Sequence, residues 1–318
     1  AKEFSAGFDA LLLNEKLSFE MTWYNNIRDG QITQVFNDLP YMVGLSSARP
    51  WYNYNKTRYY GLETGLQFTN RAGDFSYSLG GNATIQNSER LKVDEPKYRD
   101  SYMSRIGKPV DAYFGLTYLG KFETDDEALL IPQKFDDVLH AGDLKYADQN
   151  GDGIVDDNDV TMIGHSNPRL FYALNAKVAY KNFELSIIGT GRAFYDIMLG
   201  NSYFINGWGD DTYSNFVKDN IGGKYPKLTY YIVNNNFRSS QFWLTKGDFF
   251  KIQNVELAYN LPRRISQIIG GNLIRFYVRG ANLLTISKIK DVDPESISSG
   301  VYNYPLFRTF SGGIKFNF

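Results

Sequence analysis

Residues 310–318 read FSGGIKFNF, so that an aromatic, aliphatic or glycine residue occupies every second position. The residues from Phe310 to Phe318 in steps of two share one face of an extended chain, because successive side chains of a β-strand point to opposite sides. A strand that crosses an outer membrane needs this alternation, since one face meets hydrocarbon and the other meets a polar lumen. The segment therefore predicts a transmembrane β-strand.

The same alternation recurs in eight other segments of the chain. They span residues 4–12, 17–23, 60–68, 75–85, 170–180, 183–189, 247–260 and 274–279. The segment 247–260 is the least regular, because Lys251 and Gln253 fall in phase with its apolar residues. Most segments suit a tilted membrane strand of about 9 to 11 residues better than a soluble strand of about 5 or 6. We therefore expect an all-β chain that contributes nine antiparallel strands to a transmembrane β-barrel; a large soluble β-sandwich or solenoid is the alternative.

The connections between these segments alternate between short and long. The short ones are 14–15, 70–74, 181–182 and 261–272, and the long ones are 29–55, 88–167, 195–246 and 285–305. Outer-membrane barrels keep short turns in the periplasm and long loops outside the cell. The sequence thus predicts a multi-pass protein of the cell outer membrane, with long extracellular loops and a periplasmic C-terminus.

An odd number of strands indicates that this barrel is incomplete. Bacterial single-chain barrels normally have an even number. An open sheet of nine strands would leave two unpaired edges in lipid, where each unsatisfied backbone group costs several kcal/mol. We expect residues 1–318 to form the C-terminal part of one barrel domain, with another segment or chain supplying the remaining strands.

Composition excludes several classes of protein. No apolar run approaches the roughly eighteen residues of a transmembrane helix, which excludes a helical membrane protein. The chain has no cysteine, so disulfides and thiolate metal sites are excluded. Its formal charge of −1 and the lack of a basic block argue against nucleic acid as a partner.

Catalytic patterns are not evident either. The only histidines are His140 and His165, and neither stands at a recognisable spacing from a nucleophile. The acidic run 125–127 is typical of a solvated loop face rather than of an acid/base pair. We therefore predict that the chain is not an enzyme.

The second long loop contains a segment with the spacing of a calcium-binding loop. Residues 148–159 place oxygen-bearing side chains at positions one, three, five, nine and twelve, with glycine at position six. Calcium prefers six to eight oxygen ligands, and alternate residues of a tight turn converge on one point. The predicted ligands of a structural calcium ion are Asp148, Asn150, Asp152, the carbonyl of Ile154, Asp156 through a water, and Asp159. The alternative is a solvated turn without metal.

Aromatic residues in the long loops are candidate contacts for a solute or a lid protein. They are Trp51, Tyr52 and Tyr54 in the first long loop, Trp208 with Asp210 in the third, and Trp243 near its end. A flat aromatic face beside polar groups suits both sugars and peptide side chains. Such residues also form interfacial girdles or pack loops together, so this alternative stays open.

Four long segments and the C-terminus resemble one family. The segments are 145–169 (KYADQNGDGIVDDNDVTMIGHSNPR), 105–122 (RIGKPVDAYFGLTYLGKF), 247–262 (GDFFKIQNVELAYNLP), 278–295 (VRGANLLTISKIKDVDPE) and 304–318 (YPLFRTFSGGIKFNF). Their order and spacing are similar to those of SusC-like TonB-dependent outer-membrane transporters, and the resemblance covers essentially the whole chain.

This resemblance implies a 22-stranded barrel with an N-terminal plug. It also implies import of glycans or oligopeptides driven by the TonB complex, with a SusD-like lipoprotein as a lid. About thirteen strands, the plug and the TonB box would lie outside these residues. Two other function classes remain open: a passive porin or loop-displaying adhesin barrel, and a soluble extracellular β-protein with a calcium module.

Overall fold

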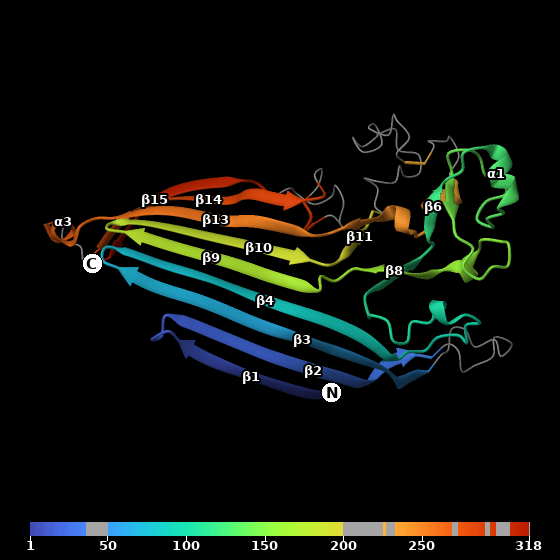
Figure 1. Cartoon of the computed structure of the whole chain (residues 1–318), viewed down its shortest axis with the longest axis horizontal. Coiled ribbons are helices and arrows are strands. Elements are labelled where there is room, and N and C mark those ends of the chain that lie inside the picture. The colour runs from blue at the N-terminus through green and yellow to red at the C-terminus, as the bar shows by residue number, and fades with distance from the viewer. Residues whose placement is uncertain are drawn as a thin grey trace.

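The computed structural model describes residues 1–35, 50–199, 225–226, 233–268, 273–289, 293–296 and 306–317. Nine long strands form one antiparallel sheet (Figure 1). They are β1 (Lys2–Leu12), β2 (Leu17–Gln34), β3 (Trp51–Ala72), β4 (Phe75–Lys92), β9 (Leu170–Tyr180), β10 (Phe183–Ala193), β13 (Phe249–Asn260), β14 (Leu273–Ser287) and β15 (Thr309–Asn317). Neighbours in the sheet follow one another in the chain. The prediction of nine strands is confirmed.

The short connections all lie at one end of the sheet (Figure 1). Asn14, Gly73 and Lys181 adopt positive φ angles of 54°, 61° and 52° in the first three turns. The left-handed conformation reverses the chain within few residues, and glycine or asparagine reaches it at low cost. The fourth connection carries the short helix α3 (Arg263–Ile268).

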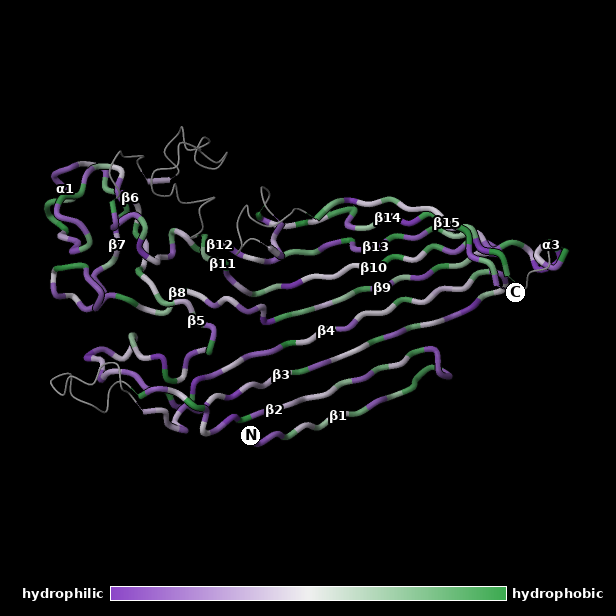
Figure 2. The backbone as a smooth tube through the Cα atoms, turned by 180° about the vertical axis from the view of Figure 1, so that it is seen from behind, coloured by the Kyte–Doolittle hydropathy of each residue, from purple (hydrophilic) through white to green (hydrophobic). Residues whose placement is uncertain are grey.

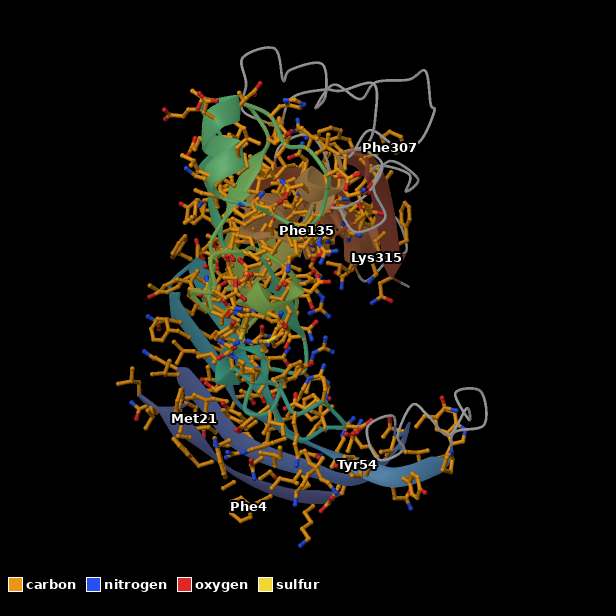
Figure 3. All side chains as sticks on the ribbon, turned by 90° about the vertical axis from the view of Figure 1, so that its right-hand side faces the viewer. Phe4, Met21, Tyr54, Phe135, Phe307 and Lys315 are labelled. Atoms are coloured by element: carbon orange, nitrogen blue, oxygen red, sulfur yellow. The ribbon has the colours of Figure 1, made fainter. Side chains whose placement is uncertain are left out.

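The sheet curves into an open arc when it is seen along the strands (Figure 3). Phe4 points away from the hollow side of this arc. Strands β2 and β3 have 18 and 22 residues. At about 3.3 Å per residue they are longer than the roughly 30 Å of a hydrocarbon core. The pairing of β2 with β3 continues to Gln34 and Trp51. The predicted loop 29–55 is therefore wrong at both ends, where the chain forms strands.

The connections from β4 to β9 and from β10 to β13 contain small sheets, at the end of the strands opposite the short turns (Figure 1). The pairs are β5 (Ala112–Gly115) with β8 (Thr161–His165), β6 (Tyr118–Lys121) with β7 (Leu144–Tyr146), and β11 (Asp196–Met198) with β12 (Leu244–Lys246). Helix α1 (Asp125–Leu130) and single 3-10 turns at 101–103, 157–159, 234–237 and 241–243 complete them. We call residues 101–165, 195–199 and 233–246 the loop module. Among the described helices, none has the length and apolar character that a membrane crossing requires.

The loop module contains the main buried core. Leu116, Leu144, Tyr146 and Val155 are at most 1% exposed and pack together. By contrast, hydrophobic and hydrophilic residues alternate along the long strands (Figure 2), and many large apolar side chains of those strands are exposed. Among the described residues, the long sheet thus has two exposed faces and no core of its own, whereas the loop module at its end has a buried core.

Candidate functional site

The register of the sheet sorts its side chains onto two faces. Directly opposite residues of antiparallel strands share a face, and this relation connects each strand to the next. The apolar face carries Phe4, Phe8, Phe19, Leu66, Leu79, Leu174, Leu185, Leu257, Phe276 and Ile314. The polar face carries Glu3, Asp9, Glu20, Glu63, Gln67, Asn82, Asn175, Lys177, Glu184, Thr190, Glu256, Arg275, Arg279 and Lys315. Because Phe4 lies on the convex side, the polar face lines the hollow of the arc.

A β-bulge explains the irregular phase of β13. The register with both neighbouring strands shifts between Ile252 and Asn254, and Gln253 is an extra residue relative to β10. A bulge of one residue reverses the sides to which the following side chains point. Lys251 is consequently opposite Thr190, on the polar face, although its position in the sequence matches the apolar residues.

Lys251 connects the sheet to the last long connection. Its side chain is 2% exposed, and Nζ lies 3.3 Å from Asp293 Oδ2. It also forms an ion pair with Glu295. A lysine this deeply buried is rare unless it is paired. The two carboxylates therefore hold residues 293–296 against the polar face.

A second group of charges spans β9, β10, β13 and β14 nearer the short turns. Arg275 donates to Glu184 at 2.8 Å and to Glu256 at 2.6 Å. Arg279 Nε donates to Glu256 at 2.9 Å, and Lys177 lies 3.2 Å from Glu184. Each carboxylate in this group has two cationic partners. The group connects four strands on the polar face, and neither of its carboxylates is unpaired.

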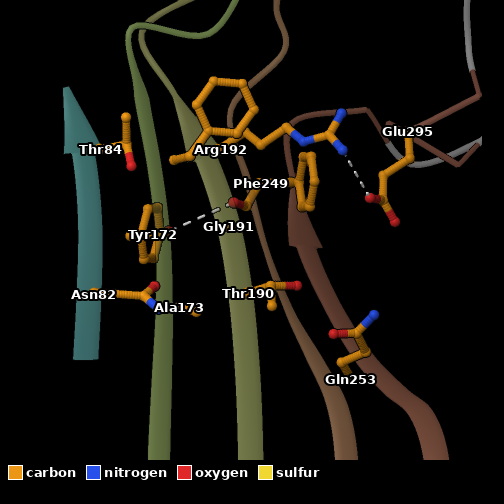
Figure 4. A pocket seen from close by; sticks show the side chains of 11 residues that line it. Asn82, Thr84, Tyr172, Ala173, Thr190, Gly191, Arg192, Phe249, Gln253 and Glu295 are labelled. Atoms are coloured by element: carbon orange, nitrogen blue, oxygen red, sulfur yellow. Dashed lines mark hydrogen bonds and ion pairs between the residues drawn. The ribbon is translucent and has the colours of Figure 1, made fainter. Parts of the chain in front are cut away.

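A hollow of about 330 Å³ opens on the polar face where β4, β9, β10 and β13 approach the long connections (Figure 4). Arg192 lies at its upper end, 3.5 Å from Glu295. The Arg192 guanidinium is 5.6 Å from the centre of the Phe171 ring and 5.8 Å from that of Phe249. The remaining lining is mainly small and polar, and includes Asn82.

Sequence patterning did not identify this hollow. Alternation places Arg192 on the polar face of β10. The pattern cannot predict its contact with Glu295, because the two residues lie far apart in the sequence. Phe249 reaches the polar face only because of the bulge at Gln253. The available signal was a lone cation, Arg192, that follows the small residues 189–191 near the end of β10.

Buried side-chain amides connect the segment 133–144 of the loop module to the segment 235–236. Asn235 and Asn236 are 0% and 2% exposed. Asn235 accepts a hydrogen bond from Gln133 Nε2 at 2.8 Å. Asn236 accepts from the backbone N–H of Leu144 at 2.9 Å and donates to Asp143 at 2.7 Å. Since an unmatched buried amide costs about 1 to 3 kcal/mol, these pairs fix how the two connections pack together.

The predicted calcium loop is a tight turn that its own side chains stabilise. Asp148 accepts hydrogen bonds from the backbone N–H groups of Gly151 at 2.7 Å and Gly153 at 2.8 Å. Both glycines have positive φ, 73° and 84°, which a residue with a side chain adopts only with strain. The hydrogen bond from the Gly153 N–H, followed by that from Gly151, lowers the pKa of Asp148.

The next alternate residues continue this arrangement. Asn150 accepts from the N–H of Asp152 at 2.8 Å, and Asp152 accepts from the N–H of Ile154 at 3.0 Å. Asp159 is completely buried, and it accepts from the N–H groups of Gln149 and Asp156, each at 2.7 Å. Asp156 also lies 3.5 Å from Lys134 Nζ. Hydrogen bonds thus close the loop from position one to position twelve.

These acids do not meet at one point. Among the residues that the structure describes, no three His, Cys, Asp or Glu side chains are grouped as a metal site requires. The carboxylates instead bind backbone N–H groups of the loop. Calcium binding by this segment stays a prediction.

The candidate aromatic contacts have different environments. Trp51 and Tyr52 are 66% and 50% exposed at the start of β3. Tyr54 packs under Lys92, whose Nζ is 3.8 Å from the ring centre. Trp243 is 3% exposed in the core of the loop module and donates to the carbonyl of Asn236 at 2.7 Å, so its ring does not face solvent. Trp208 and Asp210 lie outside the described residues.

Comparison with known proteins identifies relatives. No family model matches the chain. TonB-dependent receptor P26 of Formosa agariphila is 25% identical over 98% of this chain and 34% of its own length. TonB-dependent receptor P3 of the same organism is 22% identical over 100% of this chain and 34% of its own length. The chain is a homologue of TonB-dependent receptors. It spans about one third of the length of these curated relatives.

Solved structures agree with this relationship at the level of the fold. The RagAB peptide importer in its open-open state superposes with a TM-score of 0.72, over 99% of this chain and 34% of that chain, at 17% identity. The structure of the RagAB peptide transporter superposes with a TM-score of 0.71, over 99% of this chain and 35% of that chain, at 19% identity. The predicted β-barrel architecture is confirmed by this likeness. The relatives are named receptors rather than enzymes, in agreement with the prediction that the chain is not an enzyme.

Proposed function

We propose that this chain is the C-terminal part of the barrel of an outer-membrane importer energised by TonB. The observation that carries the proposal is the division of nine strands into an apolar convex face and a polar concave face, in a homologue of TonB-dependent receptors. A lipid-spanning barrel requires this division. The remaining strands, about thirteen if the barrel has 22, and the plug would come from another segment or chain.

The proposed orientation follows from the connections. The short turns lie in the periplasm, together with the C-terminus, and the loop module projects outside the cell. Outer-membrane lipid then contacts the apolar face. Solute passes along the polar face, lined partly by Glu63, Gln67, Asn82, Arg275 and Arg279.

The proposed partner outside the cell is a SusD-like surface lipoprotein that acts as a lid. The loop module supports this, because its buried core and amide pairs give it the rigidity that a docking surface needs. Oligopeptides and glycans are both candidate solutes. The importer to which the fold is similar is named a peptide importer, which favours oligopeptides.

We also propose that residues 148–159 bind a structural calcium ion through the predicted ligands. The support lies in donor chemistry: oxygens at positions one, three and five of a turn that contains glycine, with Asp148 kept ionised by its lowered pKa. A carboxylate oxygen that accepts one N–H retains a second lone pair for a cation. Binding would require the acids to turn inward by a small rearrangement of the loop.

Uptake in cells tests the importer proposal. The complete protein is expressed in a bacterium with and without TonB, and entry of a labelled solute is measured before and after collapse of the proton gradient. We expect uptake to require both TonB and the gradient. Undiminished entry without either would contradict active import and favour a passive barrel.

A further inference from the structure

The hollow at the end of β4, β9, β10 and β13 contains polar groups that the described protein does not use. Asn82, Thr84, Thr190 and Gln253 all line it. Within the described ranges, none of these four side chains forms a hydrogen bond. They line the hollow on the polar face (Figure 4).

Arg192 supplies an incompletely paired cation to the same hollow. Its side chain is 41% exposed, and the acid that pairs with it among the described residues, Glu295, lies at 3.5 Å. The more buried Lys251 also pairs with Glu295 and with Asp293. The planar guanidinium has five N–H donors and prefers a carboxylate that it can hold through two of them. Glu295 therefore satisfies Arg192 only in part.

The two phenyl rings beside Arg192 shape this site further. Phe171 lies opposite Arg192 on β9, and Phe249 lies opposite it on β13. Both rings are close enough for cation–π contact. They hold the guanidinium in place and provide an apolar surface beside it. A hollow of about 330 Å³ is at the small end of ligand pockets, so it fits the end of a solute rather than a whole oligomer.

We propose that this hollow is a subsite for the carboxylate of an anionic solute, with Arg192 as its ligand and Glu295 as an internal competitor. The inference rests on the proposed import function and specifies the chemistry that the lumen selects. A carboxylate gains a charge-assisted pair with Arg192, and the amides and hydroxyls below it bind the polar groups that follow. A peptide C-terminus and an oligo-uronate both present this chemistry.

Binding to the purified full-length receptor with its partner tests the subsite. The probes are a dye-labelled four-residue peptide of alanine and phenylalanine with a free C-terminus, the same peptide with a C-terminal amide, tetragalacturonate and maltotetraose. The variants are Arg192→Gln and Glu295→Gln. Arg264→Gln in α3 is the matched control, because it removes the same charge from an exposed position outside the hollow.

We expect Arg192→Gln to weaken binding of the acid peptide or of tetragalacturonate about tenfold, as loss of a charge-assisted hydrogen bond would. Binding of the amide peptide should change little. Glu295→Gln should tighten binding of the same anionic probe, because Arg192 loses its competitor. The anionic probe that responds identifies the source of the carboxylate, and the control should bind like wild type.

Three results would overturn the proposal. They are equal loss of the acid and amide peptides in Arg192→Gln, weaker binding of the anion in Glu295→Gln, and failure of either anionic probe to bind wild type more tightly than the neutral probes. The measurement needs no TonB. If the uptake test fails but anion selectivity is intact, only the proposed import function is wrong. If uptake requires TonB but anion selectivity is absent, only the proposed subsite is wrong.

Discussion

Leu79 and Asn82 lie three residues apart on β4 and face opposite sides of the sheet. Leu79 pairs with Phe68 and Ala176 on the apolar face, and Asn82 pairs with Gly65 and Ala173 on the polar face. Leu79 is four residues from the start of β4, about 13 Å along a tilted strand. This places it near the middle of an apolar band about 25 Å tall.

The two residues give a matched test of which face meets lipid. Leu79→Lys should destabilise the folded barrel by about 2 to 4 kcal/mol, the cost of a lysine at mid-bilayer depth. Asn82→Lys should cost much less, because it adds the same charge to the polar face. Folding of the complete protein into lipid vesicles, measured by urea titration, checks this. Equal loss in both variants would contradict the assignment of faces.

Some residues have roles that period-two alternation cannot reveal. The pattern predicted the faces of the residues within the alternating segments, because a strand with one apolar and one polar face selects each of those side chains separately. It left the face of Lys251 unresolved, since the extra residue Gln253 changes the phase without any composition signal. Asn235 and Asn236 are polar residues in a core, and their partners are about ninety residues away.

At the scale of elements, the long strands could be predicted and the loop module could not. The strands of the module have three to five residues. Such lengths are too short for periodicity to emerge, and packing against one another determines them. The predicted calcium loop illustrates both cases. Its spacing indicated a tight glycine-containing turn, whereas it did not indicate that the carboxylates would bind N–H groups of the turn itself.

Two of the polar contacts that attach the predicted calcium loop to its surroundings join it to distant segments of the loop module. Tyr102 donates to the carbonyl of Asn158 at 2.7 Å, and Arg238 forms an ion pair with Asp157. Ordering residues 148–159 would therefore stiffen two other segments of the loop module. We expect calcium to protect the module of the complete receptor from proteolysis, and EDTA to remove this protection.

The variant Asp148→Ala should abolish the calcium-dependent part of the protection, because position one supplies a central ligand. Asp137→Ala is the control, since Asp137 is an exposed acid of the same module outside the loop. Elemental analysis of calcium-equilibrated receptor should give one bound ion in wild type and in the control. If wild type contains no calcium, or resists protease equally in EDTA, the site does not exist.

At the scale of the whole molecule, the sheet has two ends that need partners. Among the described strands, β1 pairs only with β2, and β15 pairs only with β14. The arc in Figure 3 is open, so these edges do not meet. In lipid each unpaired backbone group would cost several kcal/mol. The chain covers about one third of the length of its curated relatives, which agrees with a sheet that further strands complete.

We therefore predict that β1 and β15 are protected from exchange only in the complete barrel. Hydrogen exchange in detergent micelles should be slow at Lys2–Leu12 and Thr309–Asn317 in the full-length receptor. It should be fast at both edges in residues 1–318 alone, because one side of each strand then lacks its ladder. The interior pair β3 and β4 provides the internal reference for each sample. Slow exchange at both edges in the isolated piece would mean that it closes by itself, and the proposed pairing with further strands would be wrong.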